Sequence, residues 1–353
     1  MTADETRQRL SRRFRGQAAS CADLGSPLYA DLLARAADDL EAGGAVWRVV
    51  EPFAGVPGGA LLALRYLGAT HRQALSGAAP ALAARYPSCG GDGEADGAWE
   101  APRALSSDAA SSRELDRWMS TGVQTNEVGR SAALLGGFLA VARATGLPLR
   151  LLEVGASAGL NLRWDRFRYE GWGPPASPVD LGDPWVGDRR PLLSPATVPI
   201  SSREGCDLAP VDPTGAEGRL RLLSFVWPDM RRRFELLDAA CTVAASTPAP
   251  VATASAEAWI ADRLASPVAG AATVVFHSVV LQYVEASARV RLVESIAAAG
   301  SRAERSAPLA WLRLEPAGAL GPSEFEVRLT TWPGGADRVI AMAHPHGTWV
   351  RWM

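Results

Sequence analysis

The sequence predicts an α/β protein, with a helical N-terminal domain over residues 1–146 followed by a parallel-sheet domain over residues 147–353. Three observations support this prediction. The chain has 353 residues, a length typical of about two domains. In the first part, apolar residues recur at helical intervals, and from Leu147 onward short apolar runs alternate with helical stretches. Such alternation is typical of a parallel sheet whose strands are joined by crossover helices.

The composition is that of a soluble globular protein, with 48% hydrophobic and 21% charged residues. No apolar run approaches the roughly 20 residues that a membrane span needs. Residues 1–17 lack the apolar stretch of a secretory signal. The formal net charge of −2 provides no global attraction to nucleic acid. We therefore expect a cytoplasmic protein that binds neither membrane nor nucleic acid.

Residues that commonly bind metals are scattered along the chain. The four cysteines lie far apart, at Cys21, Cys89, Cys206 and Cys241. The absence of a Cys-x-x-Cys pair argues against a zinc site and against a disulfide framework. His344 and His346 do not have a metal-binding spacing. The sequence therefore predicts reduced thiols and no metal cofactor.

The N-terminal domain is predicted to consist of helices and one long loop. The helical pattern over residues 28–40 ends at Gly43-Gly44, which is a typical helix stop. Residues 89–112 are rich in Gly, Asp, Ser and Ala without periodicity, and they predict a mobile surface loop. Thr125 or Asn126 can cap the last helix. The predicted helices are 28–40, about 59–75, about 112–120 and 125–143.

The second domain is predicted to contain five parallel strands and a terminal antiparallel pair. The last two strands, 325–332 and 338–343, are too close in sequence for a helical crossover, so they must pair antiparallel. Residues 168–196 are rich in Pro, Gly and Trp, and we interpret them as an insertion. The parallel strands are placed at 149–154, about 198–206, 250–254, 272–278 and 309–314, and the helices at about 158–166, 215–245, 256–265 and 285–299.

The loop after the first strand carries the most informative motif. It reads Glu-Val-Gly-Ala-Ser-Ala-Gly-Leu-Asn, from Glu153 to Asn161. This run resembles the first motif of S-adenosylmethionine (SAM)-dependent methyltransferases, which is acidic-x-Gly-x-Gly-x-Gly. Gly155 and Gly159 allow the backbone to turn tightly and to approach the cofactor. Ser157 stands where the motif has its middle glycine.

The resemblance implies a Rossmann-like, seven-stranded class I methyltransferase core that binds SAM through residues 153, 155, 157, 159 and 161. Ligands of such open sheets bind outside the carboxyl ends of the strands. The N-terminal helices and the insertion would then form the pocket for the methyl acceptor. A nicotinamide dinucleotide fits less well, because its fingerprint needs glycine at positions 157 and 160, where this chain has Ser and Leu.

The methyltransferase pattern also implies a carboxylate at the end of the second strand, which accepts hydrogen bonds from the ribose hydroxyls. Asp207 is our choice for this role. Glu170 is the alternative, because it lies nearer to the usual spacing of about 20 residues from the glycine loop. A loop carboxylate that starts a turn before Pro210 is an equally good interpretation of Asp207.

At the end of the third strand, the pattern places an acidic residue beside the adenine amino group. Ser255 stands at that position, so Glu257 is the candidate for adenine binding. Trp259 could cover the adenine, although a tryptophan on a helix face more often belongs to the core.

The fourth strand ends in His277-Ser278 and resembles the strand end that faces the transferred methyl group in small-molecule methyltransferases. His277 could lie against the cofactor and act as a general base toward a hydroxyl or amine near neutral pH. We assign His277 and Tyr283 to catalysis and Gln282 to substrate binding. The alternatives are a fully hydrogen-bonded buried histidine at 277 and helix-start packing at 282 and 283.

The same glycine loop also fits a second catalytic motif. Gly-x-Ser-x-Gly over residues 155–159 is the nucleophile elbow of α/β-hydrolases, with Ser157 as the nucleophile. That fold needs several strands before the elbow, whereas the residues before it read as helices. It also needs an oxyanion hole, for which residues 55–59 are only a weak candidate.

Over nearly its full length, the chain is similar to a bacterial family catalogued as domain of unknown function 2332. The resemblance supports the architecture and implies no activity. It draws attention to Asn126, Glu127 and Arg130 on the helix that leads into the first strand, and to Trp227 beside a helix-breaking proline. We assign these four residues to substrate binding. The stretches that carry the resemblance are 14–17, 26–29, 125–130, 151–162, 205–210, 225–229, 277–278 and 344–346.

The expected function is therefore SAM-dependent methylation of an unknown small molecule. The first alternative is a serine esterase that uses Ser157. The second is a non-catalytic binding module on a degenerate methyltransferase fold, which Ser255 in place of an acidic residue would permit.

Overall fold

The computed structural model describes residues 2–55, 61–95, 97–318 and 324–353. The chain forms two compact units, and we describe each by itself. The helical unit comprises Met1–Thr125 and Gly215–Glu235, and the sheet unit comprises Asn126–Thr214 and Leu236–Met353. The predicted boundary between the two domains lay at residue 146 instead. Two segments therefore differ from that division, because the helix before the first strand belongs to the sheet unit and residues 215–235 belong to the helical unit.

The helical unit is built from amphipathic helices around one apolar core. Residues 89–112, which were predicted to be a mobile loop, contain a helix whose Ser106 hydroxyl lies 2.9 Å from the Tyr66 hydroxyl. The prediction failed there because these small residues pack despite lacking apolar periodicity. The helices are α1 (Ala3–Asp23), α2 (Pro27–Glu41), α3 (Ala45–Val50), α4 (Leu62–Leu75), α5 (Pro80–Ala83), α6 (Glu100–Ser107), α7 (Ala109–Met119) and α9 (Ala216–Ser224).

The sheet unit contains a single eight-stranded, mostly parallel sheet in a mixed α/β arrangement. The strand order is β3-β2-β1-β4-β5-β6-β7-β8, with parallel pairing from β3 to β5 and antiparallel pairing from β5 to β8. The strands are β1 (Leu149–Val154), β2 (Ile200–Asp207), β3 (Val251–Thr253), β4 (Ala272–Ser278), β5 (Leu309–Pro316), β6 (Phe325–Trp332), β7 (Ala336–Ala343) and β8 (Val350–Trp352).

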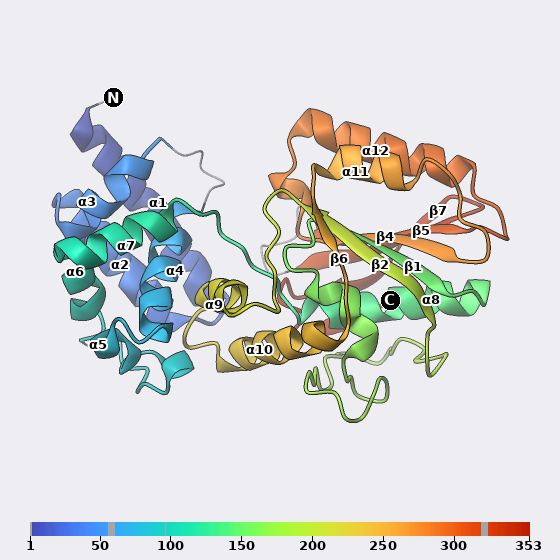
Figure 1. Ribbon diagram of the computed structural model, residues 1–353, viewed down its shortest axis with the longest axis horizontal. Helices are drawn as coiled ribbons and strands as arrows, with labels where there is room; N and C mark the ends of the chain where they lie inside the picture. Colours follow the sequence, from blue (N-terminus) through green and yellow to red (C-terminus); the bar gives the residue numbers. More distant parts are fainter. Residues whose placement is uncertain (1, 56–60, 96, 319–323) are drawn as a thin grey trace. The chain divides into compact units, whose positions relative to one another are not determined.

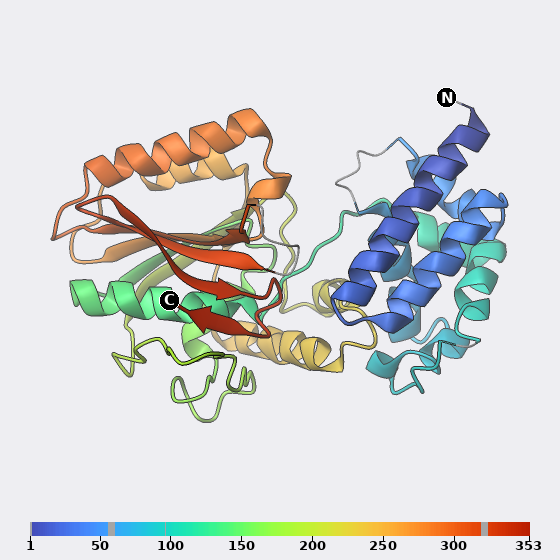
Figure 2. The same ribbon diagram turned by 180° about the vertical axis from the view of Figure 1, so that it is seen from behind.

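Helices cover both faces of this sheet. Helix α8 (Arg130–Thr145) lies along one face, and α11 (Ala256–Arg263) and α12 (Ala286–Ser301) lie along the other, as Figures 1 and 2 show from opposite sides. On the α8 face, Phe138 stacks on Trp164 with ring centroids 4.5 Å apart and meets Phe276 edge-on at 5.1 Å. Trp172 of the predicted insertion stacks on Trp164, so the insertion is anchored to this face.

Three details of the predicted sheet domain are wrong. The single helix predicted over residues 215–245 instead ends at Ser224, and a second helix begins at Arg231. Eight strands are present in the described part of the chain instead of seven, because β8 is too short to give a recognisable pattern. The segment after the glycine loop is a 3₁₀ helix, η4 (Leu160–Arg166), and not an α-helix.

Helix α10 (Arg231–Ser246) spans the division between the units. In the ranges that the structure describes, no helix is both long and apolar enough to cross a bilayer.

Candidate functional site

The loop after β1 contains three residues in the left-handed conformation. The φ angles of Gly155, Ser157 and Gly159 are +65°, +53° and +65°. A Cβ at Gly155 would lie 2.6 Å from the Val280 side chain, and one at Gly159 would lie 2.9 Å from the Val251 side chain. Both glycines are therefore required by backbone conformation and by close packing. Ser157 occupies the third left-handed position, where the related motif has glycine.

Asn126 holds this loop from one side. Its Oδ1 accepts hydrogen bonds from the N–H groups of Ala158 at 3.2 Å and Leu160 at 2.9 Å. Neither Thr125 nor Asn126 caps α8, whose N-cap is Gly129 without a side-chain hydrogen bond. The prediction that Asn126 lies on this helix or caps it is therefore wrong, because its amide oxygen binds the loop instead.

Asp207 holds the loop from the other side. It is the last residue of β2, and its Oδ2 accepts the N–H of Ser157 at 2.9 Å, while Oδ1 accepts the N–H of Ala209 at 2.9 Å. Glu170 is an exposed residue of the insertion, where its N–H donates to the Gly182 carbonyl. The structure brings Asp207 to the loop.

Every N–H group from residue 156 to residue 160 has a protein acceptor. Besides the three N–H groups already described, those of Ala156 and Gly159 donate to the carbonyls of Cys206 and Ala156, at 2.9 and 2.7 Å. Sites for pyrophosphate instead present free N–H groups at the start of an α-helix. This loop differs from such sites, because its N–H groups already have acceptors and a 3₁₀ helix follows it.

Asn161 joins the end of the loop to the residues before α8. Its Oδ1 accepts the Ser131 hydroxyl at 2.7 Å, and its Nδ2 donates to the Glu127 carbonyl at 3.2 Å. The Arg163 guanidinium donates to the Gly159 carbonyl at 2.7 Å. Asn161 and the backbone of Glu127 thus support the loop.

Arg130 links two further segments at the same edge of the sheet. Its Nη1 donates to the carbonyl of Ser278 at 3.0 Å, and its Nε donates to the carbonyl of Pro345 at 2.9 Å. The end of β4 and the His344-to-His346 segment after β7 therefore lie around Arg130. In the described ranges, no group of three or more His, Cys, Asp or Glu side chains is arranged to hold a metal ion.

Glu153 presents a buried carboxyl group near the end of β1. The residue is 3% exposed, and its Oε2 has no hydrogen-bond partner among the described residues. Burial raises the pKa of Glu153 well above its ordinary value, and the charge of Asp207 raises it further, while Arg163 and Arg130 oppose this shift. Such an unsatisfied buried group in a native protein calls for a partner, such as a ligand or water.

The end of β4 brings His277 to a carboxylate that the sequence analysis did not identify. His277 is fully buried, and its Nδ1 lies 2.7 Å from Oε1 of Glu315 on β5. Gln282 and Tyr283 follow in a short 3₁₀ helix, η5 (Leu281–Tyr283), and both are exposed. Glu315 was missed because strand pairing, and not sequence spacing, places it beside His277.

The candidates for adenine binding lie beyond β3, at the edge of the sheet. Glu257 is in the first turn of α11 and pairs with Arg291 of α12 at 3.3 Å. Ser255 is the N-cap residue of α11 and makes no side-chain capping bond. Trp259 is 5% exposed and packs in the core between the sheet and the α11 and α12 helices.

Trp227 belongs to the helical unit, unlike the other candidates. It is 6% exposed, and its ring centroid lies 6.4 Å from that of Tyr29. The neighbouring Asp229 accepts hydrogen bonds from the Ser26 hydroxyl at 2.6 Å and from the Leu28 N–H at 3.0 Å. This carboxylate satisfies the start of α2, so the segment has a structural role within that unit.

The hydrolase alternative is matched in one respect and unmatched in another. The left-handed Ser157, at a turn directly after a strand, has the geometry of a nucleophile elbow. However, β1 precedes every other strand in the described part of the chain, and the segments before it are helices. Of the weak oxyanion candidate at 55–59, residues 56–59 lie outside the described residues.

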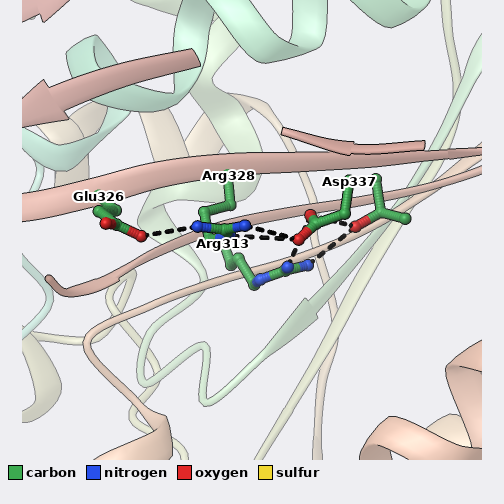
Figure 3. Close-up of polar contacts among 5 residues, drawn as sticks. Arg313, Glu326, Arg328 and Asp337 are labelled. Carbon is green, nitrogen blue, oxygen red and sulfur yellow. Dashed lines mark hydrogen bonds and ion pairs between the residues drawn. The ribbon is translucent and has the colours of Figure 1, made fainter. Parts of the chain in front are cut away.

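A separate polar cluster on β5, β6 and β7 is satisfied within itself. Figure 3 shows Arg313 and Arg328 converging on Asp337, with hydrogen bonds of 2.8 Å from each guanidinium. Arg328 also pairs with Glu326 at 2.9 Å, and Thr330 donates to Asp337 at 2.8 Å. The two arginines are balanced by two carboxylates, so the cluster joins the antiparallel strands and offers no charge to a ligand.

Comparison with known proteins identifies a family and assigns no activity. Residues 11–352 match the family described as "Uncharacterized protein conserved in bacteria (DUF2332)". No curated protein and no solved structure matches the chain.

Proposed function

The chain belongs to the bacterial DUF2332 family, whose description assigns no activity, and from that premise we propose that it is a SAM-dependent methyltransferase acting on a small molecule. The observation that carries the proposal is the hydrogen bond of 2.9 Å between the Asp207 carboxylate and the Ser157 N–H. It joins the candidate ribose carboxylate at the end of β2 to the glycine loop at the end of β1. A cofactor that uses both would be held at one point of the sheet.

The strand order supports a Rossmann-like core. The sequence β3-β2-β1-β4-β5 agrees with the first five strands of the doubly wound order, in which ligands bind where the order reverses. That point is the carboxyl end of β1 and β4, where Gly155, Ser157 and His277 are found. The three antiparallel strands that follow distinguish this chain from the seven-stranded arrangement that the motif implies.

The polar groups of the loop suit SAM better than a dinucleotide. SAM has no phosphate group. The N–H groups of residues 156–160 all donate to protein acceptors, so none of them is available to a phosphate. Asp207 would accept hydrogen bonds from the ribose hydroxyls. Oε2 of Glu153, which has no hydrogen-bond partner among the described residues, would face the methionine portion. When bound, SAM supplies an electrophilic methyl group on a sulfonium. The protein's own contribution would be mainly to place the acceptor in line with it.

The acceptor side would be formed at the same edge of the sheet. Arg130, Gln282 and Tyr283 are the candidates there, together with Asn126 and Glu127. We also propose a cytoplasmic location, because the four cysteines are free thiols, as expected in a reducing compartment.

Isothermal titration calorimetry with SAM and its demethylated product, S-adenosylhomocysteine, tests this proposal. We expect both compounds to bind at one site. If neither bound, the cofactor assignment would be refuted, and the serine hydrolase and the non-catalytic binding module would remain.

The second candidate function is a serine hydrolase, favoured by the left-handed conformation of Ser157. A fluorophosphonate probe distinguishes it, because a nucleophilic Ser157 would be labelled in the wild type and not in Ser157→Ala. We expect no labelling at this position.

A further inference from the structure

His277 and Glu315 form a buried pair on neighbouring strands. The distance between Nδ1 of His277 and Oε1 of Glu315 is 2.7 Å. Burial alone would raise the pKa of Glu315, but the hydrogen bond and charge of His277, together with the N–H groups of Val280 and Leu281, outweigh it, and the net effect lowers this pKa. A carboxylate can only accept hydrogen bonds, so Nδ1 of His277 must carry the hydrogen. In the neutral ring, the lone pair is therefore on Nε2.

The Nε2 atom of His277 is buried and has no hydrogen-bond partner among the described residues. The helical unit provides a contrast in His71, which is equally buried. Its Nδ1 lies 3.2 Å from the Ser224 carbonyl and its Nε2 lies 2.7 Å from the Ser88 hydroxyl. His71 has the two partners expected of a structural histidine, whereas His277 keeps one nitrogen unpaired.

Glu315 also connects this pair to the glycine loop. Its Oε1 accepts the N–H groups of Val280 at 3.0 Å and Leu281 at 3.3 Å. The Val280 side chain packs against Gly155, where a Cβ would lie 2.6 Å from it. The preceding residue, Val279, has a φ of +58°, which is strained for a β-branched side chain. Strain of this kind is concentrated at functional sites.

We propose that Glu315 is a positioning residue that holds His277 as the Nδ1–H tautomer, so that Nε2 can accept the proton of the methyl acceptor. This inference rests on the proposed methyl transfer. It narrows the substrate class to acceptors that lose a proton, namely hydroxyl and amine groups. Because Glu315 acts through His277, it does not itself touch the reacting atoms.

The proton transfer balances without another reagent. The acceptor oxygen or nitrogen forms a bond to the methyl carbon, and the electron pair of the broken carbon–sulfur bond stays on sulfur. Nε2 of His277 takes the proton that the acceptor loses. The resulting imidazolium is stabilised by the Glu315 carboxylate and later returns the proton to water.

Nitrogen-15 NMR of the histidine rings tests the inference on the intact protein. Four histidines are present, and a His277→Gln variant assigns the signal of interest. At an alkaline pH, where the ring is neutral, we expect Nδ1 of His277 to be protonated and Nε2 to be bare. Glu315→Gln keeps an acceptor oxygen and should preserve this tautomer, whereas Glu315→Leu should lose it. Glu326→Gln is the matched control, because Glu326 pairs opposite Glu315 in the sheet and bonds to Arg328.

Saturation with S-adenosylhomocysteine provides the second readout. The Nε2 signal of His277 should shift, and the signals of His71 should not. A protonated Nε2 in the wild type, or S-adenosylhomocysteine binding by calorimetry without a shift at Nε2, would overturn the inference and leave the proposed function standing. If S-adenosylhomocysteine did not bind, the proposed function would fail and this inference with it.

Discussion

Ser157 is the residue on which the two enzymatic interpretations make opposite predictions. Its φ of +53° costs a serine about 1–2 kcal/mol, whereas glycine adopts this conformation freely. Ser157→Gly relieves that strain, and the added freedom of the unfolded chain offsets it by roughly 0.4–1 kcal/mol. We expect this variant to remain within about 1 kcal/mol of the wild type in urea unfolding and to bind S-adenosylhomocysteine equally well. Ser157→Val should instead have a lower free energy of unfolding than the wild type, because a β-branched residue is disfavoured in this conformation. Loss of all ligand binding in Ser157→Gly would contradict the interpretation of Ser157 as a turn residue.

Glu153 should make the stability of the protein depend on pH. Burial holds the pKa of its carboxyl group above the unfolded value of about 4.3. The folded state therefore binds the proton more tightly, and this contribution is complete below about pH 4.3 and is lost as pH rises through the folded pKa. In that window, the free energy of unfolding of Glu153→Gln should rise relative to the wild type by up to about 1.4 kcal/mol per pH unit. Urea unfolding at several pH values measures the difference, and parallel curves would refute this role of Glu153.

At the scale of elements, the segment before α8 should determine the order of the glycine loop. Asn126→Ala removes the acceptor of two buried N–H groups, and each unsatisfied donor costs about 1–3 kcal/mol. We expect a loss of about 2 kcal/mol or more in the free energy of unfolding. Faster hydrogen exchange at Ala158 and Leu160 should accompany it. Asn126→Asp keeps the acceptor and should retain most of the protection. Unchanged exchange in Asn126→Ala would show that this hydrogen-bonded support is unimportant.

Strands such as β4 could be predicted because they are short, mostly apolar runs between turn residues, whereas β2 is mostly polar. β1 and β4 were predicted with the bounds that the structure has, and β6 as well. Helix α6, within the predicted loop, and strand β8 could not be predicted, because their burial depends on partners distant in sequence. The 3₁₀ helix after Gly159 was mistaken for an α-helix, since both have similar apolar spacing over one or two turns.

The candidate site was predictable only where the motif itself specifies it. The left-handed glycines followed from the motif, and Asp207 could be named from its place after a strand. Asn126 was assigned to substrate binding, with helix capping as the alternative, and the hydrogen bond that its side chain accepts from the loop 32 residues away was not foreseen. Glu315 could not be found at all, because the register of β4 and β5 brings it to His277. Side chains that meet through strand pairing leave no spacing pattern in a single sequence.

At the scale of the whole molecule, neither unit is one continuous segment of the chain. A fragment of residues 147–353 lacks α8, whose Phe138 packs on Trp164 and Phe276. We expect this fragment to lack the near-ultraviolet circular dichroism of a packed aromatic core. The fragment 126–353 restores α8 and should regain part of that signal. A cooperatively unfolding 147–353 fragment would contradict the division of the chain described above.

The binding of S-adenosylhomocysteine to Asp207→Ala, measured by calorimetry beside the wild type and Glu170→Ala, tests the proposed methyltransferase site most directly. A hydrogen bond to a charged group contributes about 1.5–3 kcal/mol, which corresponds to roughly a tenfold to hundredfold change in affinity. We predict wild-type affinity in Glu170→Ala and an affinity at least about tenfold weaker in Asp207→Ala. Equal affinity in Asp207→Ala and the wild type, or no binding to any of the three proteins, would contradict the proposed site.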